Sequence, residues 1–188
     1  MDAAVGMIEV EGVAAVIVAA DAACKTAAVE LLGWDSIGGF TTVFFSGSIS
    51  DVNAALDRGE EAARAIVERV VAAPLTRPEP ECLKHVTVPV NPEVEVKPGA
   101  LGLIETRGYG VHVPTNDSMV KTAAVEVCNV LTVQNRVVCS LIQGEVGAVR
   151  EALAVGRARV EGSENFLCAA CIPQPVPEVV RAFGRVSV

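Results

Sequence analysis

The sequence predicts an α+β protein made of two tandem ferredoxin-like units, each with the element order β-α-β-β-α-β followed by a short tail helix. Two observations carry this prediction: the chain repeats itself once, and each copy alternates short apolar strands with two helical segments. Hydrophobic residues make up 51% and charged residues 20% of the 188 residues, which suits a chain with a buried core.

The repeat is the strongest signal in the chain. Residues 6–30 match residues 102–126 without a gap at a constant offset of 96, and the run Lys-Thr-Ala-Ala-Val-Glu is identical in both copies. From Gly47 onward the offset is 97, so the copies differ in length by one residue between Glu30 and Gly47. Two copies, each long enough to fold, indicate tandem domains rather than a solenoid.

We expect a first domain over residues 1–86, a linker over residues 87–98 and a second domain over residues 99–188. The linker is rich in Pro and Val, a composition typical of an extended connection.

Periodicity and turn residues place the elements of the first copy. Short apolar runs predict strands, an Ala/Val face at helical spacing predicts the first helix, and Asp51 suits the first turn of the second. The expected elements are a strand over 5–10, a helix within 13–31, strands over 30–35 and 41–45, a helix over 50–71, a strand leading into Thr76, and a tail helix from Glu79.

The second copy repeats this pattern. We expect a strand over 100–106, a helix over 109–127 and a second helix over about 147–161. Pro114 falls near the start of the first of these helices, where a missing N–H is tolerated.

Charge and hydropathy exclude two classes of partner. The formal net charge is −8 and no basic stripe is present, which argues against nucleic-acid binding. The longest early apolar run, 13–20, is far shorter than the roughly 20 residues that span a bilayer. Asp2, Glu9 and Glu11 stand where a secretory signal carries basic residues, so we expect a cytoplasmic protein whose six cysteines are reduced.

Three motifs resemble one known family. They are Gly-x-Ile-Glu-Thr at residues 102–106, Ala-x-Asp-x-x-x-Lys-x-Ala-x-Val across both first helices, and Gly-Glu-Val-x-x-Val at residues 144–149, with a Pro-rich elbow before each tail. In both copies they are similar to the bacterial microcompartment shell family, the BMC domain. Two domains in this order resemble its tandem, non-permuted subclass.

The resemblance implies a structural protein and not an enzyme. Members of the tandem subclass assemble as homotrimers that mimic a hexagonal tile, and a central pore passes small metabolites. It also implies other shell proteins as partners in a mixed facet, enclosed enzymes, and a location in the microcompartment shell within the cytoplasm.

The resemblance also implies contacts at the edge of the tile. Lys25 and Lys121 hold the family's edge-lysine position, and each has an aspartate four residues earlier on the same helix face. A solvated cation at a helix end is the alternative interpretation. Arg77 matches the family's docking arginine, whereas the second copy has a neutral amide there. The expected edge residues are Asp21, Lys25, Arg77, Asp117, Lys121 and Gln174.

The loop between the second and third strands lines the pore in this family. The expected pore-lining residues are Ile37, Gly38, Gly39, Phe40, Gln134, Asn135 and Arg136. If Arg136 points inward, three guanidinium groups favour anionic or carbonyl-bearing metabolites. The alternative is that Arg136 pairs with a carboxylate and only frames the hole.

We expect no metal and no cofactor. Cys168 and Cys171 lie three apart in an expected strand, so they should point to opposite faces and pack as small apolar side chains. The pore loops lack the cysteine that ligates an iron–sulfur cluster in some tandem members. An iron–sulfur or redox-active shell protein, and a small-molecule-binding regulator on the same scaffold, remain the alternatives.

Two further residue types invite a chemical interpretation. Glu9 and Glu105 stand alone in apolar strands at equivalent positions, and without a partner His or Lys they predict a structural contact. His85 and His112 are too few for a metal site and are taken as ordinary polar residues.

Overall fold

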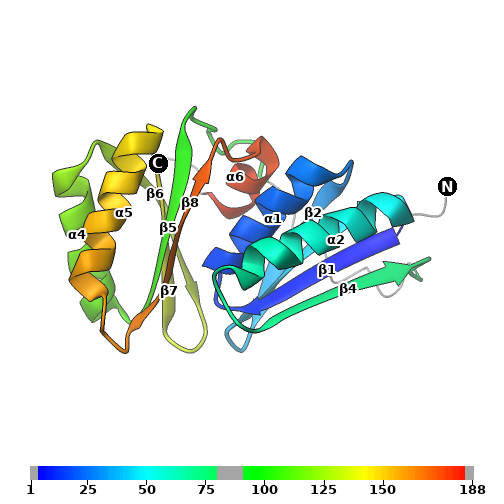
Figure 1. Cartoon of the computed structure of the whole chain (residues 1–188), viewed down its shortest axis with the longest axis horizontal. Helices are drawn as coiled ribbons and strands as arrows, with labels where there is room; N and C mark the ends of the chain where they lie inside the picture. The colour runs from blue at the N-terminus through cyan, green and yellow to red at the C-terminus, as the bar shows by residue number, and fades with distance from the viewer. Residues whose placement is uncertain (1–3, 80–90, 185–188) are drawn as a thin grey trace.

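The computed structural model describes residues 4–79 and 91–184, which form two four-stranded antiparallel sheets with helices packed on them (Figure 1). The first domain contains β1 (Ala4–Glu11), α1 (Ala14–Thr26), β2 (Glu30–Ile37), β3 (Phe40–Gly47), α2 (Ile49–Arg64) and β4 (Val70–Thr76). Its strand order, β2-β3-β1-β4, is that of a ferredoxin-like sheet.

The second domain repeats the same topology. It contains β5 (Ala100–Arg107), α4 (Tyr109–Thr122), β6 (Val125–Val133), β7 (Val137–Gly144), α5 (Val146–Val160), β8 (Phe166–Pro173) and the tail helix α6 (Pro177–Phe183). The strand order β6-β7-β5-β8 matches that of the first sheet position by position. The predicted tandem α+β fold is confirmed.

Helix α1 lies within the expected interval, whereas the helices expected over 50–71 and 109–127 are too long. Helix α2 ends at Arg64 because β4 must begin at Val70 to pair with β1, and α4 ends at Thr122 because the backbone is extended from Ala123. Apolar residues continue beyond both helices, so periodicity alone does not mark their ends. The tail helix expected from Glu79 and part of the expected linker lie outside the described residues.

Pro114 lies in the interior of α4 and not in its first turn, so that part of the prediction is wrong. Its missing N–H leaves the carbonyl of Gly110 without the usual helical donor. Gly110 is exposed, with open space where a side chain would point, so water can reach this turn.

The one-residue difference between the copies lies in a hairpin turn. Ile37 pairs with Phe40 across two turn residues, whereas Val133 pairs with Val137 across three. The two glycines of the shorter turn both have positive φ, as a tight two-residue hairpin requires. The insertion therefore falls inside the interval that the repeat predicts.

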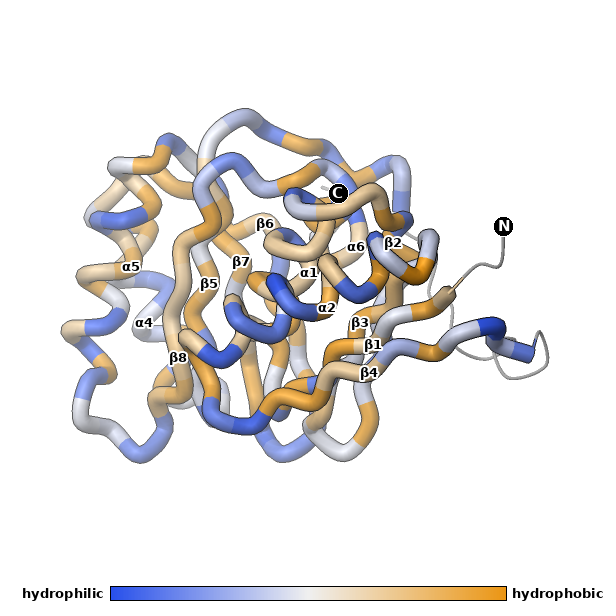
Figure 2. Tube along the Cα trace, turned by 45° about the vertical axis from the view of Figure 1, so that its right-hand side comes forward, coloured by the Kyte–Doolittle hydropathy of each residue, from blue (hydrophilic) through white to orange (hydrophobic). Residues whose placement is uncertain are grey.

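Helix α1 lies between the first sheet and the second, and α2 packs beside α1 on the first sheet (Figure 1). One apolar cluster joins α1, α2 and the first sheet to one face of the second sheet, through Leu101, Leu103, Cys139, Leu141, Cys168 and Ile172. A second cluster joins α4 and α5 to the opposite face of the second sheet. Figure 2 shows hydrophobic residues along the strands, whereas most strongly hydrophilic residues lie in turns and on helices. Across the described residues, every helix is too short or too polar to cross a membrane.

Candidate functional site at the junction of the two domains

A carboxylate of the second domain caps a helix of the first. Glu105 on β5 is 2% exposed, and its Oε2 accepts hydrogen bonds from the backbone N–H groups of Val13 (2.7 Å) and Ala14 (2.9 Å). These amides begin α1, which has no side-chain cap of its own. A negative charge at this end satisfies unpaired donors and interacts favourably with the helix dipole. The structural contact predicted for Glu105 is confirmed.

Burial and hydrogen bonding act in opposite directions on this carboxyl group. Burial raises the pKa of Glu105, and the two amide hydrogen bonds oppose that rise by stabilising the charged form. Gly12 is required beside it, because its φ is +90° and a Cβ there would overlap Glu105 Oε1. The close approach of the two domains at this point therefore depends on a glycine.

Two of the predicted edge residues of the first copy, Asp21 and Lys25, lie at the other end of the same junction. Lys25 Nζ donates to Asp21 Oδ2 (2.6 Å) and to the carbonyl of Pro173 (3.2 Å). The second oxygen of Asp21 accepts from the N–H of Val176 at 2.7 Å. Gln174 lies between these two partners in the chain and has a φ of +50°. The junction thus brings Asp21 and Lys25 next to the Gln174 segment.

Within residues 4–79 and 91–184, the equivalent pair of the second copy, Asp117 and Lys121, has no such neighbour. Lys121 and Asp117 form the same pair at 2.7 Å, but their side chains are 71% and 55% exposed, against 39% and 7% for Lys25 and Asp21. Arg77 is exposed and repeats the positive φ of Gln174, at +53°. Among the described residues, Asp21 and Lys25 are therefore engaged at the junction, whereas Asp117 and Lys121 are largely exposed.

The predicted pore residues gather at the two hairpin turns, which lie side by side at the bottom of Figure 1. Asn135 Nδ2 donates to the carbonyl of Gly38 at 3.0 Å, which ties the second turn to the first. Ile37 and Arg136 are exposed, and Gly39 is buried beneath Asn135. The remaining members differ in setting: Gln134 is exposed, whereas Phe40 is half-buried with Arg69 over its ring at 5.6 Å.

Arg136 makes no ion pair with any other described residue, and its backbone carbonyl accepts from the N–H of Gly108 at 2.7 Å. The backbone contact holds the turn, whereas the exposed side chain brings its guanidinium close to Gly108.

The two cysteines of the Cys-x-x-Cys motif lie on opposite faces of β8, as the alternation of strand side chains predicts. Cys168 belongs to the cluster shared with the first domain, and Cys171 packs against the cluster beneath α4 and α5. Burial raises the pKa of Cys168 well above its usual value, so its thiol stays protonated. Among the described residues no group of three or more His, Cys, Asp or Glu is placed to hold a metal ion.

The sequence interpretation missed a buried polar network in the second domain. His112 bonds Thr106 Oγ1 through Nδ1 (2.9 Å) and Ser140 Oγ through Nε2 (2.7 Å), and Asn116 Nδ2 donates to the same Ser140 oxygen (2.7 Å). Burial lowers the pKa of His112 to about 4. The equivalent residues of the first copy are Val10, Val16, Ala20 and Val43. Comparing the copies position by position would have revealed this replacement of apolar by polar residues.

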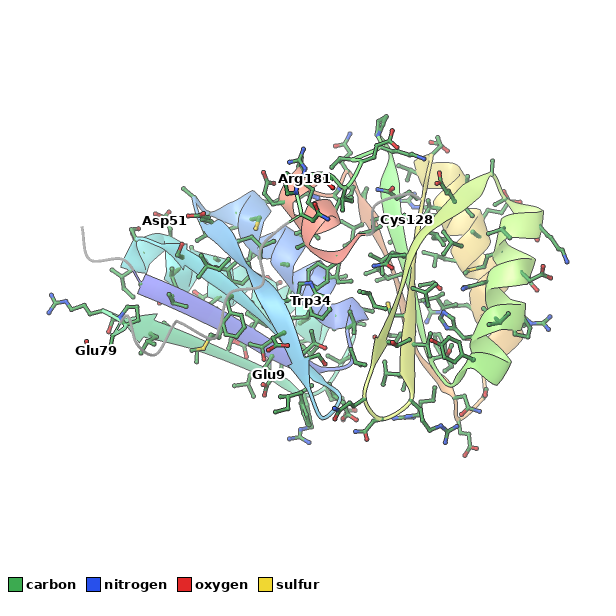
Figure 3. All side chains as sticks on the ribbon, turned by 180° about the vertical axis from the view of Figure 1, so that it is seen from behind. Glu9, Trp34, Asp51, Glu79, Cys128 and Arg181 are labelled. Atoms are coloured by element: carbon green, nitrogen blue, oxygen red, sulfur yellow. The ribbon has the colours of Figure 1, made fainter. Side chains whose placement is uncertain are left out.

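The tail helix completes the contact between the domains. Trp34 on β2 stacks on Phe183 of α6 with ring centroids 5.1 Å apart, and its Nε1 donates to the carbonyl of Ala182 at 2.8 Å. Figure 3 shows Trp34 from behind, on the strand that α6 meets. The fold and this junction together define a class: a tandem-domain protein whose equivalent units pack head to tail through different surfaces.

A family model gives this class its family. The model of the BMC domain matches residues 4–76 and 100–175, so the chain belongs to the BMC domain family. Carboxysome assembly protein CcmO of Synechococcus elongatus is 28% identical over 187 residues, covering 94% of this chain and 67% of that protein. The shell protein PduA of Citrobacter freundii is 42% identical over 82 residues, covering 43% of this chain and 88% of that protein.

Two further matches extend over most of the chain. The CcmO protein of Synechocystis is 25% identical, and this chain covers 62% of its length, so the chain spans about two thirds of its carboxysome assembly relatives. The crystal structure of a microcompartment protein from Desulfitobacterium hafniense is 24% identical, with a TM-score of 0.44, and the match covers 96% of this chain and 99% of that one.

Proposed function

We propose that three copies of this chain close into a ring of six domains, which serves as a non-enzymatic tile of a bacterial microcompartment shell and has a central pore. Membership of the BMC domain family and relatives named as shell proteins support the shell role. Other shell proteins in the same facet and enclosed enzymes are the proposed partners, and the proposed location is a microcompartment in the cytoplasm.

The main support for a closed ring of six domains is the junction between the two domains of one chain. It joins helix α1 of one unit to the sheet of an equivalent unit, so the two contacting surfaces differ. A contact between different surfaces of equivalent units generates either a closed ring or a filament. Two domains per chain make a six-domain ring from three chains, which matches the hexagonal geometry of single-domain members.

The adjacent hairpin turns support the pore. Asn135 and Gly38 already bring two turns together within one chain, and six domains in a ring would bring six turns to the axis. Three glycine turns would alternate with three turns carrying Gln134 and Arg136. Because Arg136 makes no ion pair with a described residue, three guanidinium groups are available to attract anionic or carbonyl-bearing metabolites.

Molecular mass in solution tests the ring. Size-exclusion chromatography with light scattering should give the mass of three chains, or of six if two rings stack. A stable monomer at micromolar concentration would refute the proposal.

Solute flux tests the pore. Arg136→Glu should reduce the passage of an anionic solute through reconstituted shells, because it reverses three charges at the axis. Arg159→Glu, an exposed change on α5, is the matched control and should leave flux unchanged. Equal flux for wild type and Arg136→Glu would show that Arg136 does not line the pore.

A further inference from the structure

The first sheet carries an outward-facing carboxylate at the position of Glu105. Glu9 on β1 is equivalent to Glu105 by the offset of 96, and strand alternation directs it away from the core residues Ile8 and Val10. Figure 3 shows Glu9 on the side of the first sheet that faces away from α1 and α2. Its Oε2 accepts from Thr42 Oγ1 at 2.9 Å, and no other described residue bonds it. The carboxylate is thus held in place on a face that α1 and α2 leave open.

The first turn of α4 repeats the first turn of α1 but lacks its cap. Tyr109 and Gly110 are equivalent to Val13 and Ala14, and α4, like α1, follows a glycine with positive φ. No side chain caps α4, and within the described residues neither of these two amides donates a hydrogen bond. Open space lies beside Gly110. An acceptor from outside the chain can therefore reach both N–H groups.

The exposed apolar residues follow the same repeat. The described residues include eight exposed large hydrophobic side chains, and six of them correspond to residues that are packed into the junction within the chain. The six exposed residues are Val71, Leu75, Tyr109, Val113, Val120 and Val130. Their counterparts, in the same order, are Cys168, Ile172, Val13, Ile17, Cys24 and Trp34, all members of the shared cluster or packed against it. They lie on two separate surfaces, β4 of the first domain and α4 with β6 of the second, and exposed apolar surfaces of this kind mark interfaces.

The geometry points to a specific ring-closing contact: Glu9 of one chain accepts hydrogen bonds from the backbone N–H groups of Tyr109 and Gly110 in the next copy. This inference rests on the proposed ring and identifies the partner of its open surfaces as a second copy of the chain. The outer face of the first sheet then receives the apolar side of α4, as the second sheet receives α1. Each chain has one donor surface, at the start of α4, and one acceptor surface, on the outer face of the first sheet. In a closed ring every donor surface therefore meets an acceptor surface.

The repeat also assigns the other end of this contact. Pro173 and Val176, which bind Lys25 and Asp21, are equivalent to Thr76 and Glu79 by the offset of 97. Lys121 therefore donates to the carbonyl of Thr76 in the next copy, and Asp117 accepts from the N–H of Glu79 there. This accounts for why the second pair is open in a single chain while the first is engaged.

A substitution at Glu9 tests the contact. Glu9→Ala should raise the concentration at which trimers dissociate by about tenfold or more, because two helix donors lose their acceptor at each of the seams between chains. Glu9→Gln should have a smaller effect, because its amide oxygen still accepts. Asp57→Ala, an exposed change on α2, is the control and should behave as wild type. Circular dichroism should show that all three variants stay folded.

Hydrogen exchange gives an independent measurement. The amides of Tyr109 and Gly110 should exchange slowly in the wild-type trimer and quickly in Glu9→Ala. A wild-type trimer in which both amides exchange quickly, or a Glu9→Ala trimer as stable as wild type, would overturn this contact and leave the proposed ring standing. A wild-type chain that stays monomeric, or forms rings only with another shell protein, would overturn both.

Discussion

The junction within the chain makes a sharp prediction about Glu105. In Glu105→Ala the N–H groups of Val13 and Ala14 lose their acceptor at a buried site. Each buried donor left without a partner costs about 1–3 kcal/mol, so the substitution should lower the free energy of unfolding by about 2–6 kcal/mol. Domains of this size are stable by about 5–15 kcal/mol, so the loss is a large part of the total.

Glu105→Gln separates the hydrogen bonds from the charge. Burial raises the pKa of Glu105, which shows that its charged form is costly at this site. Gln removes the charge and keeps an acceptor oxygen, so its cost should be only about 1 kcal/mol. If the hydrogen bonds to α1 outweigh the cost of the buried charge, the free energy of unfolding should decrease from wild type to Glu105→Gln and again to Glu105→Ala.

Two measurements check this ranking. Urea unfolding, followed by circular dichroism at one fixed protein concentration, gives the stabilities, and the concentration must be fixed because assembly contributes to them. Hydrogen exchange at Val13 and Ala14 reports the contact directly and should become fast only in Glu105→Ala. Asp57→Ala, an exposed change on α2, serves as the control. If Glu105→Ala unfolds at the wild-type midpoint with both amides still protected, the capping role is wrong.

Three more predictions follow from the junction and the cores. Because burial holds the pKa of His112 near 4, below its usual 6.5, the free energy of unfolding should fall as pH drops from about 6.5 to 4, as urea titrations would show. This pH dependence should disappear when the four network residues are replaced by their counterparts in the first copy. The substitutions are Thr106→Val, His112→Val, Asn116→Ala and Ser140→Val. Lys121→Asp, at a side chain that is 71% exposed, should leave folding intact but weaken edge-to-edge sheets under the electron microscope, and unchanged sheets would exclude an edge role for Lys121. Gly12→Ala should lower the melting temperature more than Gly38→Ala, because both have positive φ but only Gly12 faces a buried carboxylate.

The spacing of residues along the chain was enough to predict the domain organisation and the order of the elements. The constant offset of the repeat established two domains with one element order, and it bracketed the insertion that the structure places in the second hairpin turn. Strand alternation alone separated Cys168 from Cys171. These features depend on spacing along the chain, so the sequence contains them. The helix ends at Arg64 and Thr122 did not follow, because apolar residues continue past each helix and the pairing of the next strand decides where the helix stops.

Only the tertiary structure decided which residues meet. Glu105 reaches Val13 across 92 positions, and Lys25 reaches Pro173 across 148, so no local pattern links them. The same holds for His112, whose partner Ser140 lies on another strand and whose burial sets its pKa. The sequence showed that each copy carries an equivalent strand glutamate, aspartate and lysine. The packing of α1 on the second sheet determined that Glu105, Asp21 and Lys25 are engaged at the junction. Their equivalents Glu9, Asp117 and Lys121 are left open. That asymmetry arises because a chain of two units satisfies only one of the two contacts that its repeated surfaces can make.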